Sequence, residues 1–184
     1  MDFQIEITKA VSSRINEIDF NNLVFGKNYT DHMFVAEYIG GNWQNARVVP
    51  FGNLSLSPAS SFMHYGQAIF EGMKAFKNPA GEPLLFRPEQ NHKRWNISAE
   101  RMGMPGIPYE LFIRSLNELV WMDRDWIPTQ EGCSLYLRPF MFAADEFIVD
   151  KDDNSIMRTE KHFSAMFEEA GFTILTQFFQ KGFP

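Results

Sequence analysis

Residues 64–101 constrain the fold of this chain more than any other stretch. They read HYGQAIFEGMKAF, then a short turn, then LLFRPEQNHKRWNISAER. The first part is rich in aromatic and apolar residues, which favours strands. The second part carries basic residues at regular spacing and starts at Pro88, a residue suited to the first position of a helix. The stretch therefore predicts strands joined to a helix, with basic side chains held beside an apolar pocket, an arrangement suited to a phosphorylated anion.

Two turns predict hairpins. Gly40–Gly41 lies between apolar segments, and glycine reaches the positive φ of a tight turn at little cost. The sequence NPAGE at 78–82 separates another pair of apolar segments. The strands expected around these turns are 32–39, about 47–51, 73–77 and 83–87.

Two helices and a further strand complete this part. A helix from Pro88 should bury Trp95, Ala99 and Met102 and end near Gly103. A second helix should follow Pro108, with an apolar face of Phe112, Leu116, Leu119 and Val120. Residues 134–142 predict a buried strand, with Pro139 at a bend or an edge. Hairpins and helices without regular βαβ alternation predict an α+β fold with a mostly antiparallel sheet.

The sequence changes character after Ile148. Residues 150–154 are polar, residues 159–170 have the periodicity of an amphipathic helix, and residues 172–179 are typical of a strand. We therefore expect two parts, a domain over 1–148 and an unrelated helix–strand tail over 149–184.

Composition narrows the class of protein. The chain has 184 residues, of which 45% are hydrophobic, so it can bury a sizeable core. Its net charge of −6 argues against a general nucleic-acid or anionic-membrane binder. The single cysteine, Cys133, suits a reducing compartment. With acidic residues near the N-terminus and no long apolar run, we expect a soluble cytoplasmic protein.

Three groups of residues are candidates for a site. Arg94 can bind a phosphate bidentately, although a solvated helical arginine is the simpler interpretation. Tyr136 and Arg138 are two residues apart on a strand, so they share a face and suit a carboxylate. An ion pair between Arg138 and Asp145 or Glu146 is the alternative.

The remaining candidates are weaker. Tyr65, Phe70 and Phe76 are either pocket-lining residues or ordinary core residues. The four histidines are scattered, so no metal site is predicted. Asp31 and His32 are strand neighbours that face opposite ways, and Cys133 is expected to be a small core residue.

Four ordered blocks resemble one family, the branched-chain amino acid aminotransferases, which are pyridoxal-phosphate enzymes of fold type IV. The blocks are FGKNYTDHMF at 25–34, HYGQAIFEGMKAF at 64–76, LFRPEQNHKRWNISAERM at 85–102 and LYLRPFMFAADEF at 135–147. The resemblance covers about 1–148 and implies the family's small N-terminal domain, an α+β fold.

The resemblance implies roles for six residues. Arg94 matches the arginine that contacts the phosphate of pyridoxal 5'-phosphate. Substrate-side positions are matched by Tyr65, Phe70, Lys74, Tyr136 and Arg138. The family transfers an amino group between leucine, isoleucine or valine and 2-oxoglutarate. Its catalytic lysine and most phosphate contacts come from a large second domain, and no lysine of this chain matches that lysine.

Residues 150–184 resemble instead the C-terminal end of an S-adenosylmethionine-dependent protein N-terminal methyltransferase, through D-x-S-x-x-R, F-x-x-A-G and Q-x-G-F-P. A generic helix–strand appendage is the alternative.

These resemblances lead to three hypotheses. The first is a truncated aminotransferase that is inactive alone, with weak or no cofactor binding. The second is a non-catalytic interaction or dimerisation module that exposes Phe70, Phe140 and Phe142. The third, methyltransferase activity, is disfavoured because no glycine-rich cofactor loop is present.

Overall fold

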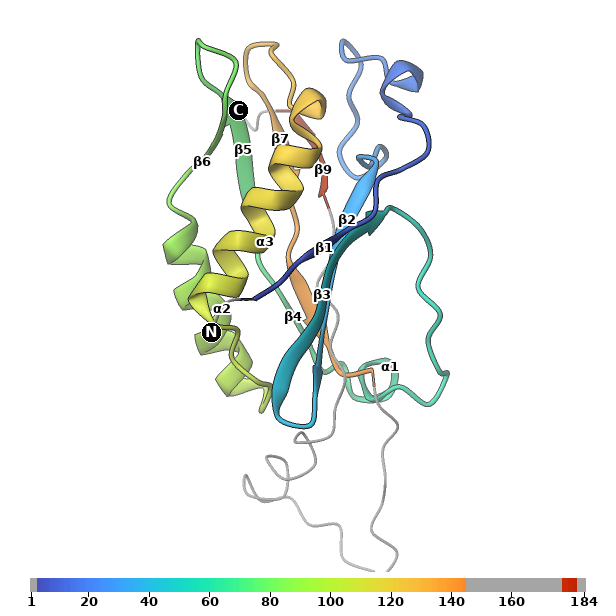
Figure 1. The fold of residues 1–184 in the computed structure, drawn as a ribbon, viewed down its shortest axis with the longest axis vertical. Helices are drawn as coiled ribbons and strands as arrows, with labels where there is room; N and C mark the ends of the chain where they lie inside the picture. Colours follow the sequence, from blue (N-terminus) through green and yellow to red (C-terminus); the bar gives the residue numbers. More distant parts are fainter. Residues whose placement is uncertain (1–2, 145–176, 182–184) are drawn as a thin grey trace, which may run out of the picture.

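The computed structural model describes residues 3–144 and 177–181 (Figure 1). Strands and helices are mixed along the chain, as expected for an α+β protein. The strands are β1 (Glu6–Ile7), β2 (His32–Ile39), β3 (Asn42–Pro50), β4 (Ala68–Phe70), β5 (Met73–Lys77), β6 (Pro83–Leu85), β7 (Cys133–Leu137), β8 (Phe140–Phe142) and β9 (Gln177–Lys181). The helices are α1 (Ser61–Tyr65), α2 (Pro88–Arg101) and α3 (Tyr109–Met122), with 3-10 turns at Ile15–Glu17 and Arg124–Trp126.

The first sheet is built on the predicted Gly40–Gly41 hairpin. Strands β2 and β3 pair antiparallel, and β1 adds in parallel to β3, giving the order β1-β3-β2. Both glycines have positive φ, 57° and 78°, as the turn requires. The return strand is longer than expected because pairing begins directly after the turn, at Asn42 opposite Ile39.

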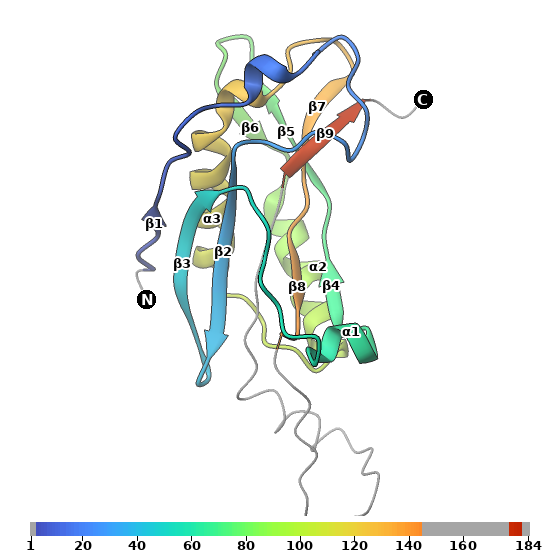
Figure 2. The same ribbon diagram turned by 90° about the vertical axis from the view of Figure 1, so that its right-hand side faces the viewer.

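The second sheet has four strands in the order β6-β5-β7-β9, each pair antiparallel. The hairpin of β5 and β6 is the one predicted from NPAGE. Strand β9 lies at the sheet edge next to β7, with Leu135 opposite Phe179. Figure 2 shows β9 beside β7 at one end of the molecule. The expected helix over 159–170 lies outside the described residues.

The predicted strand at 134–142 is interrupted at Arg138 and Pro139. Strand β7 ends at Leu137 and β8 begins at Phe140, because proline cannot donate to a ladder and bends the strand, as expected. A matching break separates β4 from β5 at Glu71 and Gly72. Strand β8 pairs with β4, and β7 pairs with β5. The two neighbouring segments are therefore interrupted at the same level, and Glu71 of one break bonds to Pro139 of the other.

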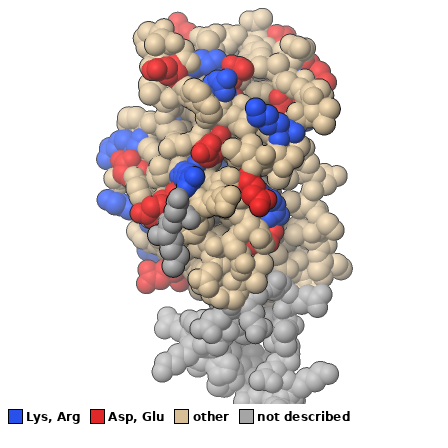
Figure 3. Space-filling model, in the orientation of Figure 1, with Lys and Arg blue, Asp and Glu red and all other residues tan. Residues whose placement is uncertain are grey.

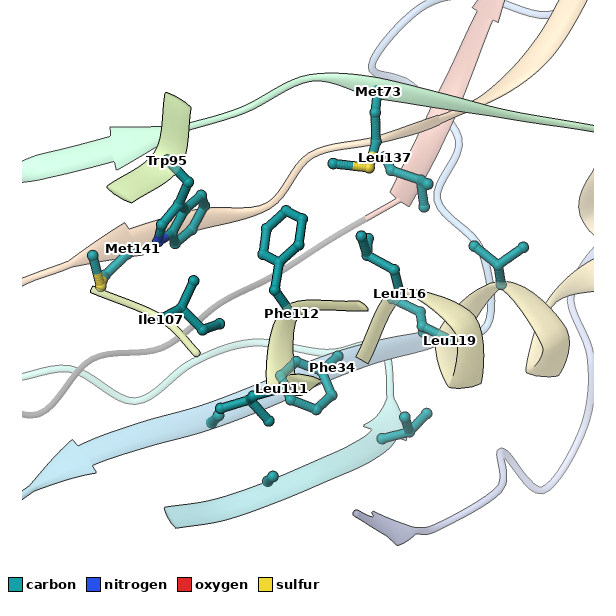
Figure 4. Packing of buried hydrophobic residues seen from close by; sticks show 14 of the residues in the cluster. Phe34, Met73, Trp95, Ile107, Leu111, Phe112, Leu116, Leu119, Leu137 and Met141 are labelled. Carbon is teal, nitrogen blue, oxygen red and sulfur yellow. The ribbon is translucent and has the colours of Figure 1, made fainter. Parts of the chain in front are cut away.

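The core lies around α3. In Figure 4, Leu116 of α3 points toward Met73 and Leu137 of the second sheet, whereas Leu111 lies beside Phe34 of the first sheet. Leu111 is fully buried on the broad apolar side of the helix, whereas Arg114, Asn117 and Trp121 on the opposite side are exposed. Helix α3 thus packs between the first and the second of these sheets.

Helix α2 follows its prediction at all but one position. Trp95 and Ala99 have no exposed surface. Met102 is 37% exposed, so the expectation that it faces the core is wrong. It lies just after the helix, and its N–H turns back to the carbonyls of Ser98 and Ala99. Gly103 follows with φ 63°, as a helix stop of this kind favours.

Among the helices in the described ranges, none is long and apolar enough to cross a membrane. On the face drawn in Figure 3, acidic and basic side chains are interspersed, and neither sign forms a large patch on that face.

Candidate functional site

Arg94 lies on α2 and faces the β4–β5 break. Its Nε–H donates to Glu71 Oε1 at 3.1 Å and one Nη–H donates to Glu71 Oε2 at 2.8 Å, so the pair is bidentate. The Arg94 side chain is nevertheless 58% exposed, whereas that of Glu71 is 10% exposed. The hydrogen bonds that Arg94 donates to Glu71 raise the pKa of Arg94, partial burial opposes this, and the carboxylate charge adds to it. The guanidinium is therefore held along one edge and open along the other.

Glu71 is fixed from several sides. Its backbone N–H donates to the Pro139 carbonyl at 2.9 Å, across the two strand breaks. The buried Asn91, one turn before Arg94 on α2, donates from Nδ2 to Glu71 Oε2 at 2.8 Å and to the Gly72 carbonyl at 3.1 Å. Two helical side chains thus converge on one carboxylate.

Phe70, Tyr136 and Arg138 form a second group of contacts. The Arg138 guanidinium lies 4.4 Å from the centre of the Phe70 ring, within cation–π range, and an Nη–H donates to the Tyr136 hydroxyl at 2.9 Å. Leu135 and Leu137, on the opposite face of β7, are buried. The expectation that Tyr136 and Arg138 share the non-core face is confirmed.

Gly72, directly before β5, and Lys74, on β5, lie next to this group. Lys74 is opposite Tyr136 in the β5–β7 pair. A Cβ atom on Gly72 would stand 2.0 Å from the Tyr136 hydroxyl oxygen. Only glycine allows the tyrosine to lie across the chain there. The Tyr136 ring is also packed edge-on by Phe25, with ring centres 5.5 Å apart.

The aromatic candidates are surface residues. Phe70 is 65% exposed, Tyr65 63% and Phe76 39%, so the interpretation of these three as ordinary core is wrong. Tyr65 ends α1, and its ring centre is 6.3 Å from that of His64. The alternative ion pair of Arg138 with Asp145 or Glu146 lies outside the described residues.

The structure thus brings five of the six predicted residues to the two strand breaks, with Tyr65 further back along the chain. Glu71, Asn91 and Gly72 were not predicted, although they contact this group. A signal for Glu71 is present in the sequence, since it is an acidic residue within the apolar run AIFEGMKAF. The partner of that acid could not be read from the sequence because it lies 23 residues away on a helix.

A separate buried cluster involves the N-terminal segment. His32 Nδ1 and Asp123 Oδ1 are 2.6 Å apart, and His32 Nε2 accepts the Ala10 N–H at 2.9 Å. Burial raises the pKa of Asp123, against the lowering by hydrogen bonds from Thr30 and His32. The accepted N–H at Nε2 fixes the neutral tautomer, with the proton on Nδ1 facing Asp123. The cluster connects elements of the fold and does not contact the strand breaks.

No group of three or more histidine, cysteine, aspartate or glutamate side chains within residues 3–144 is arranged to hold a metal ion. A cavity of ≈ 210 Å³ lies over β1 and β3, lined by Gln4, Glu6, Asn45, Ala46 and Arg47. It contains none of the candidate residues.

Similar solved structures define the class of fold. A branched-chain amino acid aminotransferase from Escherichia coli matches with a TM-score of 0.53 at 17% identity, over 80% of this chain and 40% of that one. The pyridoxal-phosphate form of the enzyme from Thermobaculum terrenum matches with a TM-score of 0.51 at 16% identity, over 82% and 40%. The fold is therefore that of the small domain of a fold-type-IV aminotransferase.

Sequence relatives identify the family. The chain is 48% identical over 128 residues to branched-chain-amino-acid transaminase 1 of Bacillus subtilis and 43% identical over 146 residues to aminotransferase 2 of that organism. The aminotransferase of Mycolicibacterium smegmatis is 43% identical over 140 residues. No family model matches the chain. By its relatives, this chain is a homologue of the branched-chain amino acid aminotransferases.

The similarity has a definite extent. These alignments cover 69–79% of the chain but only 36–39% of the relatives' length. The expected resemblance of residues 150–184 to a methyltransferase is not borne out by the comparisons. Apart from β9, those residues also lie outside the described part.

Proposed function

We propose that this chain supplies one wall of the cofactor and substrate site of a branched-chain aminotransferase. In this proposal Arg94 binds the phosphate of pyridoxal 5'-phosphate. Phe70, Lys74, Tyr136 and Arg138 line the substrate side, with Tyr65 at its margin. The observation that carries the proposal is the arrangement of Arg94. Its guanidinium is paired with Glu71 along one edge, and the other N–H donors face solvent next to a group of aromatic and cationic side chains.

The donor set fits the phosphate. Glu71 occupies the Nε edge of the guanidinium, and no other acceptor within residues 3–144 bonds it. The remaining N–H groups suit a phosphate, which accepts several charge-assisted hydrogen bonds in one plane. Pyridoxal phosphate, when bound, supplies an electron-withdrawing ring that stabilises charge at the substrate α-carbon.

The substrate-side residues suit a branched-chain amino acid. Arg138 offers a cation for the carboxylate, oriented by the Tyr136 hydroxyl and the Phe70 ring. The exposed Phe70 ring offers apolar area for an aliphatic side chain. The corresponding 2-oxo acids carry the same carboxylate and would use the same groups.

We further propose that the 184 residues alone do not transfer amino groups. The reaction needs a lysine that binds the cofactor covalently and moves a proton at the substrate carbon. Lys74 lies opposite Tyr136, on the proposed substrate side. Borohydride reduction of the chain with pyridoxal phosphate, followed by peptide mapping, should give no stoichiometric adduct at one lysine. A stoichiometric adduct with leucine-dependent turnover would overturn this.

The phosphate role has its own test. The chain should bind pyridoxal phosphate more tightly than pyridoxal, which lacks only the phosphate. Spectroscopic titration with both compounds measures the ratio of the two affinities. Equal affinities would contradict the assignment of Arg94 to the phosphate.

A second candidate function is self-association through the second sheet. Phe76 and Leu84 are direct cross-strand partners on its non-core face and are 39% and 50% exposed. A second copy of the chain could cover them, since exposed apolar patches favour association. Phe70 is exposed as this hypothesis expects, but Phe142 is only 4% exposed. A single species of monomer mass in sedimentation velocity, unchanged with concentration, would rule this out.

A further inference from the structure

We propose that Glu71 is the positioning residue for Arg94, orienting the guanidinium so that its open edge meets the cofactor phosphate. The inference rests on the proposed role of Arg94. It adds a residue that need not touch the cofactor or the substrate. It also explains why a buried acid stands beside a site for an anion, where charge alone would be unfavourable.

The contacts define the orientation. A side-on pair through Nε and one Nη fixes the guanidinium plane, because both N–H bonds must point at one carboxylate. The carboxylate cannot rotate freely, since Asn91 donates to the same Oε2 that receives the Arg94 Nη–H. Without Glu71, the half-exposed arginine would sample many rotamers, and binding phosphate would have to order it.

The Glu71 backbone extends the same control to the substrate side. Its N–H bonds to Pro139, next to Arg138, and the following residue, Gly72, lies against the Tyr136 hydroxyl. The dipeptide Glu71–Gly72 therefore contacts Arg94, on the proposed cofactor side, and also the segment that carries the proposed substrate-side residues Tyr136 and Arg138. A shift at Glu71 should move both.

Charge and orientation predict opposite effects of Glu71→Gln. Removing a negative charge near the anion should tighten phosphate binding if charge dominates. Losing the bidentate pair should weaken phosphate binding if orientation dominates, because the amide offers only one acceptor oxygen to Arg94. The sign of the change therefore separates a positioning residue from a competing anion.

The first experiment observes Arg94 directly, without any ligand. In the ¹⁵N-labelled 184-residue chain, we expect the Nε–H of Arg94 to exchange with water at least about tenfold more slowly than that of the exposed Arg101, because it is bonded to a buried carboxylate. Glu71→Gln should remove most of that protection. Equal exchange of Arg94 and Arg101 in the unmodified chain would overturn the proposal, even if the variant failed to fold.

The second experiment titrates the same proteins with inorganic phosphate and with pyridoxal phosphate. Glu71→Gln should weaken both by about fivefold to tenfold, as expected for loss of charge-assisted bonds that order the arginine. Glu89→Gln is the matched control, because Glu89 lies on the same helix as Arg94 and its side chain is 41% exposed. Unchanged or tighter binding by Glu71→Gln would overturn the proposal. If the unmodified chain binds neither compound, the role of Arg94 fails, and the exchange measurement still decides the role of Glu71.

Discussion

Individual residues at the two strand breaks determine the shape of the candidate site. Gly72 is required for a steric reason, since a Cβ atom would stand 2.0 Å from the hydroxyl oxygen and 2.8 Å from Cζ of Tyr136. Both atoms belong to a side chain whose ring is packed by Phe25 and whose hydroxyl accepts a hydrogen bond from Arg138. The ring therefore cannot move without disturbing its neighbours.

Gly72→Ala should destabilise the chain by about 1–3 kcal/mol, as for other overpacked positions. Urea unfolding measures the loss. Gly52→Ala is the control, because its nearest atom would be 4.0 Å away, and it should be neutral or slightly stabilising. Tyr136→Phe should recover part of the loss in the Gly72→Ala background, since it deletes the nearest atom. No destabilisation by Gly72→Ala would mean that Tyr136 does not lie across the glycine.

Asp31 makes the stability of the fold depend on pH in the acidic range. Burial raises the pKa of this carboxyl, but hydrogen bonds from the Arg14 N–H, Ser13 and Trp126, with the charge of Arg14, lower it to a net value below its usual range. A carboxyl whose pKa is lowered by folding stabilises the fold at pH values above its pKa in the unfolded chain, about 3.9. This stabilisation is lost as the pH falls through the pKa of the folded chain. Asp31→Asn should be less stable at neutral pH and should lose less stability between about pH 5 and about pH 3. Parallel stability curves for the two proteins would contradict this.

Helix α3 contributes one broad buried face to the core, which includes Leu111, Phe112, Leu116, Leu119 and Val120. Leu111→Ala should cost about 2–5 kcal/mol in unfolding free energy, as expected for a fully buried leucine. Ile97→Ala on α2, where the side chain is 51% exposed, should cost much less. Equal costs in urea unfolding would show that α3 does not pack between the sheets.

Local signals predicted the elements better than their contacts. Gly40–Gly41, NPAGE, Pro88 and Gly103 mark real boundaries, because turn and helix-end geometry depends on a few adjacent residues. The pairing of β4 with β8 and of β9 with β7 has no such signal, since it joins distant segments. The same holds for the bond between Glu71 and Arg94. The candidate residues were found because their motifs resemble a family, whereas their supporting partners required the folded chain.

On the scale of the whole molecule, the division of the chain at about residue 148 remains our proposal. Strand β9 belongs to the second part yet pairs with β7 of the first. In a central antiparallel strand, successive amides point alternately to the two neighbours. Loss of β9 should therefore expose alternate β7 amides and leave those facing β5 protected.

A chain shortened to residues 1–144 tests this by amide hydrogen exchange. We expect it to remain folded, with faster exchange at alternate β7 positions only. Global unfolding would contradict an independent first domain. Unchanged protection throughout β7 would show that the pairing with β9 contributes nothing in solution.

The central claim is that Arg94 binds the phosphate of pyridoxal phosphate. Its most direct test is the ratio of affinities for pyridoxal phosphate and pyridoxal, measured in the full chain, in Arg94→Gln and in Arg101→Gln. Arg101 is the matched control, since it lies exposed at the end of the same helix. We predict that Arg94→Gln brings the ratio close to one, while Arg101→Gln leaves it at the value of the unmodified chain. An unchanged ratio in Arg94→Gln would contradict the account.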